Sequence, residues 1–327
     1  MPAYDALMGS PRQTQVRPTH GVSVVIPAYN QPRMLSEALQ SVHEQTLPAT
    51  EVIVIDDCSA EPLERVTSYP AGLPLRFIRH RTNHGPAASV VHCIQEARCE
   101  LIATLNHDDL WEPELLERLT GALSAHPEAC LAFCDHGIMR ADGQRDKHLS
   151  LEQSARYTRA DLQPGLLAGA RLYESALLQK AVAASSFALV RRGALDPALI
   201  GTGSDMWDYF LTVGACLTGR PAVYVAERLG WYRVSPTMLS ATHADPHKQI
   251  ELARPQTAIL VIILRSRRLR AIHRAAGRRL GAAIGRSLAT AVHTRKLRSV
   301  ARAIVCILAG ARDARRLSSR DRRSADA

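Results

Sequence analysis

The amino-acid sequence predicts an α/β fold with a mainly parallel central sheet flanked by helices, followed by a helical extension at the C-terminus. Two observations support this prediction. Over residues 22–135, short apolar runs rich in Val, Ile and Leu alternate with segments of helical periodicity, which is the pattern of an α/β fold. Beyond residue 247 the chain is rich in Ala and Arg, keeps a helical period and contains no strand signal.

The elements of the first half follow one another in a regular order. Five apolar runs are predicted strands, at residues 22–26, 52–55, 75–79, 101–105 and 130–135. Helices are predicted at residues 32–45, from about residue 62, at 84–98 and at 113–125, with Pro32 in a favourable first turn and Asn30 as a candidate cap. Such alternation indicates parallel strands covered on both faces, because right-handed crossovers return the chain to the same edge.

The second half is less regular. A strand is predicted at residues 183–191, a helix at 205–217, and one or two strands at 222–232. Residues 1–20 contain three prolines and no apolar period, so we expect a flexible arm there. The predicted organisation is therefore an arm at 1–20, an α/β domain at 21–245 and a basic helical extension at 246–327.

Acidic pairs follow two of the predicted strands. Asp56 and Asp57 come after the second strand, and Asp108 and Asp109 come after the fourth, preceded by His107. The carboxyl ends of parallel strands share one edge, where ligands bind. The first pair suits hydrogen bonds from a ribose hydroxyl or a base N–H, whereas the second suits a hard cation such as Mg²⁺ or Mn²⁺. The alternative for both pairs is a helix cap, since Asp favours that position.

A third acidic pair, Asp205 and Asp208, lies at the start of the helix predicted at 205–217. A carboxylate beside an apolar wall can act as a general base. The alternative is a structural role, in which the negative charge complements the helix dipole.

Several common sites and signals are missing from the sequence. It contains no Gly-x-Gly-x-x-Gly after the first strand, no Walker-type phosphate loop and no Gly-x-Ser-x-Gly elbow. Residues 1–20 lack the apolar core of a signal peptide, and no apolar run reaches the 18 residues of a membrane span.

Cys130, Cys134 and His136 form a weak zinc candidate, and we expect ordinary core thiols in a reduced, cytoplasmic protein.

Positive charge is concentrated in the C-terminal part. Residues 251–327 carry 19 Lys and Arg against 4 Asp and Glu, although the whole chain has a net charge of only +10. Two interpretations are open. The extension lies on an anionic membrane, which would make the protein peripheral on the inner face, or it packs on the catalytic domain. Nucleic-acid binding is not expected, because aromatic residues do not alternate with the basic ones.

Five segments, taken in order, resemble the family 2 inverting glycosyltransferases with the GT-A fold. They are VSVVIPAYN at 22–30, EVIVIDDCS at 51–59, LIATLNHDDLWEP at 101–113, GSDMWDYFLTVG at 203–214 and RLGWYRVSPTMLS at 228–240. The resemblance implies transfer of a hexose from a nucleoside-diphosphate-sugar donor to a glycan or lipid-linked acceptor, in cell-surface polysaccharide or glycolipid synthesis.

The resemblance also implies a role for each matching residue. Asp205 is expected to be the general base, with Asp208 as the second candidate, and a divalent metal is expected at Asp108 and Asp109. The nucleotide sugar is expected to lie against Pro27, Ala28, Tyr29, Asn30, Asp56, Asp57, Asn83, Gly85, Asn106 and His107.

Three departures from the family pattern keep rival functions open. Asn106 stands where many members carry Asp, Ser89 and the residues after it replace an Ala-Arg-Asn segment, and Ser204 replaces a frequent Glu. A non-catalytic nucleotide-sugar or glycan binding protein is therefore the main alternative. A nucleotidyltransferase is the second, but the Gly-rich basic loop that it requires after the first strand is missing.

Overall fold

The computed structural model of the chain describes residues 19–235, 245–293 and 297–325. The predicted arm lies outside these residues, except that Thr19 and His20 begin the first strand, β1 (Thr19–Ala28). Residues 236–240 of the fifth motif also lie outside them.

The core of the molecule is one mixed sheet with the strand order β3-β2-β1-β4-β9-β6-β10-β5. Its first half is parallel and consists of β1, β2 (Glu51–Asp56), β3 (Leu75–Arg79) and β4 (Cys99–Thr104). Next, β9 (Ala188–Arg191) runs antiparallel between β4 and β6 (Leu131–Arg140), and β6 pairs in parallel with β10 (Ala222–Val234). Short antiparallel partners complete the sheet: β5 (Leu110–Trp111), β7 (Arg145–Asp146) and β8 (Gly165–Leu167).

Alternating side chains of the parallel strands enter two separate cores, one on each face. In β2, Val52 and Val54 pack in one core with α2 (Pro32–His43) and α5 (Leu115–Ala125). Ile53 and Ile55 enter the other core, with α4 (Pro86–Glu96) and α9 (Trp207–Leu217). Because both faces are buried, the strand reads as a continuous apolar run, which is why it was predictable from sequence.

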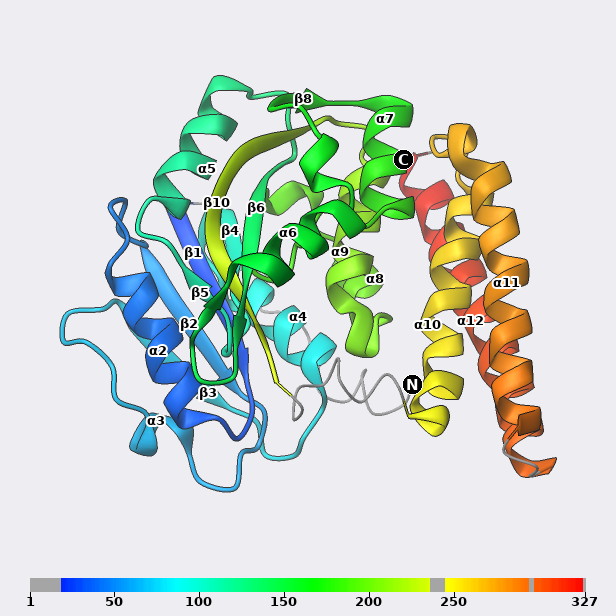
Figure 1. Cartoon of the computed structure of the whole chain (residues 1–327), viewed down its shortest axis with the longest axis horizontal. Helices are drawn as coiled ribbons and strands as arrows, with labels where there is room; N and C mark the ends of the chain where they lie inside the picture. Colours follow the sequence, from blue (N-terminus) through cyan, green and yellow to red (C-terminus); the bar gives the residue numbers. More distant parts are fainter. Residues whose placement is uncertain (1–18, 236–244, 294–296, 326–327) are drawn as a thin grey trace.

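Shorter helices lie in the other connections, one between β2 and β3 and the rest in the second half of the sheet-bearing part (Figure 1). They are α3 (Leu63–Val66), α6 (Lys147–Arg156), α7 (Gly169–Tyr173) and α8 (Pro197–Gly201). Single turns lie at η1 (Arg159–Asp161), η2 (Glu174–Leu178), η3 (Arg192–Ala194) and η4 (Ser204–Met206).

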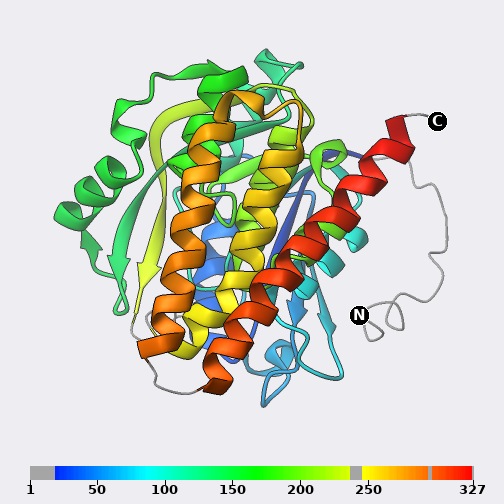
Figure 2. The same ribbon diagram turned by 90° about the vertical axis from the view of Figure 1, so that its right-hand side faces the viewer.

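The C-terminal extension packs on the sheet-bearing part of the chain. It comprises α10 (Pro246–Arg265), a turn at η6 (Arg270–Ile272), α11 (His273–His293) and α12 (Leu297–Ala325), and Figure 2 shows these helices side by side. Ile259 and Ile263 of α10 share a buried core with α9. At Gly310 of α12 a Cβ atom would overlap the carbonyl oxygen of Arg254, so glycine permits the close approach of α12 to α10.

The predicted elements are present, with shifted ends. The prediction that Asn30 caps α2 is wrong, because Gln31 precedes the helix and the Asn30 side chain accepts a hydrogen bond from Ala60 N at 2.8 Å. The strand predicted from residue 183 begins only at Ala188, since the preceding residues form a turn closed by Phe187 N and Ala183 O at 3.0 Å.

The described residues agree with the expectation of core thiols. All seven cysteines are free, and Cys130 and Cys134 are buried. Burial raises the pKa of both thiols. Within the described ranges, no cluster of three or more His, Cys, Asp or Glu side chains could hold a metal ion. None of the described helices has the length and apolar content required to cross a bilayer.

Candidate active site

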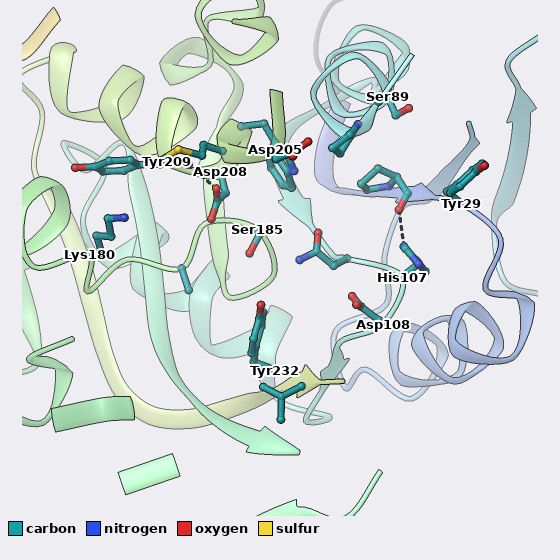
Figure 3. Close-up of a pocket in the computed structure, with 18 of the residues that line it drawn as sticks. Tyr29, Ser89, His107, Asp108, Lys180, Ser185, Asp205, Asp208, Tyr209 and Tyr232 are labelled. Atoms are coloured by element: carbon teal, nitrogen blue, oxygen red, sulfur yellow. Dashed lines mark hydrogen bonds between the residues drawn. The ribbon is translucent and has the colours of Figure 1, made fainter. Parts of the chain in front are cut away.

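One large cavity, of about 960 Å³, opens where the parallel strands end and where α9 begins. The loop after β1, the loop that contains Asp108 and the helix start at Asp205 all contribute to its wall. Leu252 and Gln256 of α10 also belong to it. Figure 3 shows Tyr29, His107 and Asp108 on one side of this cavity, Lys180 and Tyr209 on the opposite side, and Asp205, Asp208 and Ser185 between them.

Most of the predicted site residues line this cavity. They are Pro27, Ala28, Tyr29, Asp57, Asn83, Gly85, Asn106, His107, Asp108, Asp205 and Asp208. The structure thus brings together Asp57, Asp108 and Asp205, which are far apart along the chain. Three predicted residues are not part of the wall: Asn30, Asp56 and Asp109.

Asp57 follows β2 and is held in place by three hydrogen bonds. Its carboxylate accepts from His80 Nδ1 at 2.8 Å, His84 N at 3.0 Å and Gly85 N at 2.8 Å. Burial raises the pKa of Asp57, but these hydrogen bonds outweigh it, so the pKa is lowered from its usual value. Gly85 has a φ of +86°, a conformation that glycine adopts without strain. The carboxylate is therefore preorganised at the cavity wall.

Asp56 and Asn30 support the same wall from behind. The Asp56 carboxylate accepts hydrogen bonds from Ser59 N at 2.9 Å, Leu63 N at 3.1 Å and Arg79 Nη1 at 2.5 Å. Asn30 donates its backbone N–H to Ser59 Oγ at 2.9 Å. The polar groups of both residues bond to the loop after β2, and neither residue belongs to the cavity wall, so a contact of Asn30 or Asp56 with the nucleotide sugar stays a prediction.

Asp108 and Asp109 are neighbours with different surroundings. Asp108 points into the cavity (Figure 3). Asp109 is fully buried and accepts from Ser186 Oγ at 2.6 Å, Asn106 Nδ2 at 3.2 Å and Arg233 N at 3.0 Å. Burial, and then the charge of Asp108, raise the pKa of Asp109 to about 8. The Asp109 carboxyl thus joins the Asp108 loop to β10 and is not part of the cavity wall, and its predicted role as a metal ligand stays a prediction.

His107 and Arg233 complete this loop. His107 Nδ1 lies 3.1 Å from the carbonyl oxygen of Pro27, so this nitrogen is the donor. Arg233 is buried and donates from Nε to the carbonyl oxygen of Asp108 at 2.7 Å and from Nη2 to Glu37 at 2.6 Å. Sequence reasoning did not single out Arg233, whose role depends on a contact across the sheet.

Asp205 lies in η4, and its carboxylate forms an ion pair with Lys248 of α10. One turn further along, Asp208 Oδ1 accepts from its neighbour Tyr209 N at 2.8 Å. Burial lowers the pKa of Lys180, and the charge of Asp208 acts in the opposite direction. The contact with Lys248 was not predicted, because nothing in the sequence distinguishes this lysine from the other cations of the basic tail.

The half of the cavity formed by β6, α6 and η1 was also missed by sequence reasoning. His136, Gln153, Tyr157 and Arg159 line it. Arg159 is only 2% exposed, and its Nε donates to Asp135 at 2.8 Å. These residues belong to none of the five motifs, and His136 was singled out only as part of the zinc candidate, so the sequence contained no signal that would place them at this cavity.

The cavity fits a divalent cation bound together with a phosphorylated ligand. Mg²⁺ and related cations commonly use one or two protein carboxylates, with the remaining ligands supplied by phosphates and water. Asp108 supplies one such carboxylate at the cavity wall, and no described cluster of three acidic, His or Cys residues competes with it.

Comparisons with known proteins identify a family. The model of the family described as "Glycosyl transferase family 2" matches residues 23–197, more than half of the chain. The putative glycosyltransferase EpsE of Bacillus subtilis is 34% identical over 108 residues, 32% of this chain and 39% of that protein. The putative teichuronic acid biosynthesis glycosyltransferase TuaG of the same organism is 26% identical over 139 residues, 42% of this chain and 55% of that protein. The chain therefore spans less than two thirds of the length of these relatives.

Solved structures show the same fold at low sequence identity. S. aureus TarS in complex with UDP-GlcNAc matches with a TM-score of 0.64 and 18% identity, covering 88% of this chain and 79% of that chain. The mannosyltransferase PcManGT from Pyrobaculum calidifontis, in complex with GDP-Man and Mn²⁺, matches with a TM-score of 0.54 and 16% identity, covering 95% of this chain and 92% of that chain. The fold is GT-A, and the chain belongs to glycosyl transferase family 2.

Proposed function

We propose that this family 2 glycosyltransferase moves a hexose from a nucleoside-diphosphate-sugar donor to an acceptor hydroxyl with inversion, in the synthesis of cell-surface polysaccharide or glycolipid. One observation carries the proposal. Asp57, Asp108 and Asp205 come from three separate motifs and line one cavity large enough for a nucleotide sugar.

In this proposal the donor lies along the ends of β1, β2 and β4. Asp57 accepts a hydrogen bond from the base, and Pro27, Ala28 and Tyr29 contact the nucleoside, with Asn83 and Gly85 beside them. Asn106 and His107 lie where the sugar and diphosphate would follow. TarS and PcManGT were solved with UDP-GlcNAc and with GDP-Man, which supports a nucleoside-diphosphate sugar as the donor class.

Asp205 is the proposed general base. The acceptor oxygen attacks the anomeric carbon, the bond from that carbon to the diphosphate oxygen breaks, and Asp205 takes the hydroxyl proton. A single displacement of this kind inverts the anomeric centre. Because Oδ2 of Asp205 pairs with Lys248, we assign Oδ1 to the acceptor hydroxyl. Asp208 remains the second candidate.

A divalent cation, Mg²⁺ or Mn²⁺, belongs to the proposal, with Asp108 as its protein ligand. When bound, the cation neutralises charge on the leaving diphosphate. Asp109 and Arg233 hold the Asp108 loop in position.

The experiment is a turnover assay of the full chain against a panel of nucleotide sugars, with Mn²⁺ or with EDTA. Donor hydrolysis or transfer that requires Mn²⁺ is expected, and Asp108→Asn should reduce it by about 10² or more, because such a cation contributes several kcal/mol. Asp142, in an exposed turn, provides the matched control Asp142→Asn. Donor binding without turnover under any condition would instead favour the non-catalytic binding protein.

Contact with an anionic membrane is proposed for α12. Ile304, Val305 and Leu308 are 45–63% exposed, and Arg312 and Arg315 are exposed on the same helix. An apolar strip beside arginines suits the headgroup region of a membrane, which would bring a lipid-linked acceptor close. The predicted location, peripheral on the cytoplasmic face, depends on this contact.

Liposome flotation tests the membrane contact. The full chain should float with phosphatidylserine vesicles and not with phosphatidylcholine vesicles. Val305→Glu combined with Leu308→Glu should abolish flotation, whereas Leu151→Glu, at an exposed leucine of α6, should not. Equal flotation of all three proteins would remove α12 from the proposal.

A further inference from the structure

A cluster of charged side chains whose hydrogen bonding is incomplete borders the half of the cavity that β6, α6 and η1 form. It consists of Asp135, His136, Arg159 and Arg228, and we call it the Asp135 cluster. Arg159 Nε donates to Asp135 Oδ1 at 2.8 Å, and Arg228 Nη2 donates to Asp135 Oδ2 at 3.4 Å. The His136 ring stacks on Phe187 with a centroid distance of 4.4 Å. His136 and Arg159 line the cavity.

Three buried atoms of this cluster have no hydrogen-bond partner: Arg159 Nη2, His136 Nδ1 and Arg228 Nε. Among the described residues only six buried side-chain nitrogen or oxygen atoms are unpaired, so half of them lie at one place. Each such atom costs roughly 1–3 kcal/mol, and folded proteins rarely retain them without a reason. Two of the three belong to Arg159 and His136, which line the cavity, so a ligand in the cavity would supply their missing hydrogen-bond partner.

The charges of the cluster indicate the nature of this ligand. Two guanidinium groups face a single carboxylate, which leaves one positive charge uncompensated. Burial, and then the charges of Arg159 and Arg228, lower the pKa of His136 well below its usual value, so His136 is neutral. A guanidinium with an unpaired N–H favours a carboxylate or a phosphate over a neutral hydroxyl.

The cluster lies on the acceptor side of the cavity. Strand β6 is three strands away from β1 in the sheet, which is roughly 14 Å at the usual strand spacing. The proposed nucleotide residues lie at the β1 end, and Asp205 lies between the two sides of the cavity (Figure 3). The Tyr157 ring lies 5.6 Å from the Arg159 guanidinium and also lines the cavity.

We propose that the acceptor carries an oxyanion, a carboxylate or a phosphate, which binds to Arg159 with His136 as an additional hydrogen-bond partner. The inference depends on the glycosyltransferase function proposed above, and it narrows the acceptor to anionic glycans. The oxyanion would come either from a uronic acid or from a phosphorylated sugar, which share this chemistry.

The test compares matched probes on the full chain saturated with Mn²⁺ and the nucleoside diphosphate that the donor panel selects. Calorimetry should give methyl glucuronide, or methyl glucoside 6-phosphate, a Kd at least about tenfold lower than that of methyl glucoside. Whichever anionic probe binds more tightly identifies the source of the oxyanion. Arg159→Gln should remove the preference. Arg159→Lys, which keeps the charge beside Asp135, should reduce it in a chain that still folds.

Two controls make the result decisive. Arg156→Gln removes an exposed arginine next to the same Tyr157 ring and should keep the preference. Donor hydrolysis without acceptor should be unchanged in Arg156→Gln, and a failure of the proposed function would appear in that assay, in the wild-type chain as well, and not in the binding assay. Equal binding of the three probes to the wild-type chain would overturn the inference. Anion binding that occurs only in the absence of the nucleoside diphosphate would also overturn the inference, because the cluster would then bind the donor diphosphate.

Discussion

The two walls of the cavity differ in how completely their buried polar groups are paired. We call the part of the cavity around Asp57 the donor wall, because the sugar donor is proposed to bind there. On this wall the Asp57 carboxylate accepts three hydrogen bonds, and His80 is bonded in turn to His92 at 2.8 Å. The Ser89 hydroxyl is the one unpaired buried atom on the described part of this wall. On the acceptor wall, the Asp135 cluster has three unpaired atoms. The comparison indicates that the donor wall is preorganised, whereas the acceptor wall is completed by its ligand.

The largest effect is expected from a substitution of the proposed general base, Asp205, which lies between the two walls. Asp205→Asn should lower kcat by about 10²–10⁴-fold, because the amide cannot accept the proton of the attacking hydroxyl. The Kd of the nucleoside diphosphate should stay within about twofold, since the donor wall is unchanged. Steady-state kinetics and calorimetry check the two quantities. Asp208→Asn should have the smaller effect on kcat, and the reverse order would move the base assignment to Asp208.

The second test concerns Lys248, which connects the extension to the base. Lys248→Met should lower kcat by about tenfold, because a charge-assisted bond of roughly 1.5–3 kcal/mol no longer holds the Asp205 carboxylate. Lys248→Arg should restore most of the activity. Arg254→Met is the matched control, since Arg254 lies on the same helix and pairs with Asp313. Wild-type kcat in Lys248→Met would show that Lys248 does not position the Asp205 carboxylate for catalysis.

A third prediction probes the paired wall. His80→Asn should raise the Kd of the nucleoside diphosphate about fivefold, because Asp57 loses one of three donors, a bond of about 1 kcal/mol. His84→Asn is the control, as His84 bonds to Asp57 through its backbone N–H. An unchanged Kd in His80→Asn would mean that the two backbone donors alone position Asp57.

The smallest expected effect is a pH dependence of stability from the acceptor wall. Buried His136 stays neutral in the folded protein, while the unfolded chain binds a proton near pH 6.5. The unfolded state therefore binds more protons below that pH, and the free energy of unfolding falls as the pH decreases. Between pH 6.5 and 5.5 this group accounts for about 1 kcal/mol.

Denaturant unfolding at the two pH values measures this contribution. His136→Gln should flatten the pH dependence by that amount. His148→Gln, at an exposed histidine of α6, should leave the dependence as in the wild type. An equal pH dependence of the free energy of unfolding in the wild type, His136→Gln and His148→Gln would contradict a buried, neutral His136.

The parallel strands and the five motifs were predictable because their signals are local. A strand buried on both faces, such as β2, reads as an apolar run, and acidic residues at its end mark the ligand edge. From these signals the sequence predicted the fold class, the family and most of the cavity residues on the donor wall. The local pattern does not separate Asp57 from Asp56 or Asp108 from Asp109, because adjacent carboxylates look alike in it. The family resemblance alone favoured Asp57 for the nucleotide base and Asp108 as the principal metal ligand.

By itself, the sequence determined the alternation of strands and helices, the family resemblance and the positions of the acidic pairs. Only the tertiary structure decided that Asp57 and Asp108 face the cavity while Asp56 and Asp109 do not. It also decided that Lys248 reaches Asp205, and that Arg159 Nη2 and His136 Nδ1 have no hydrogen-bond partner. These outcomes depend on contacts between residues tens of positions apart. Strand pairing and helix packing set such contacts, and no local period or motif encodes them.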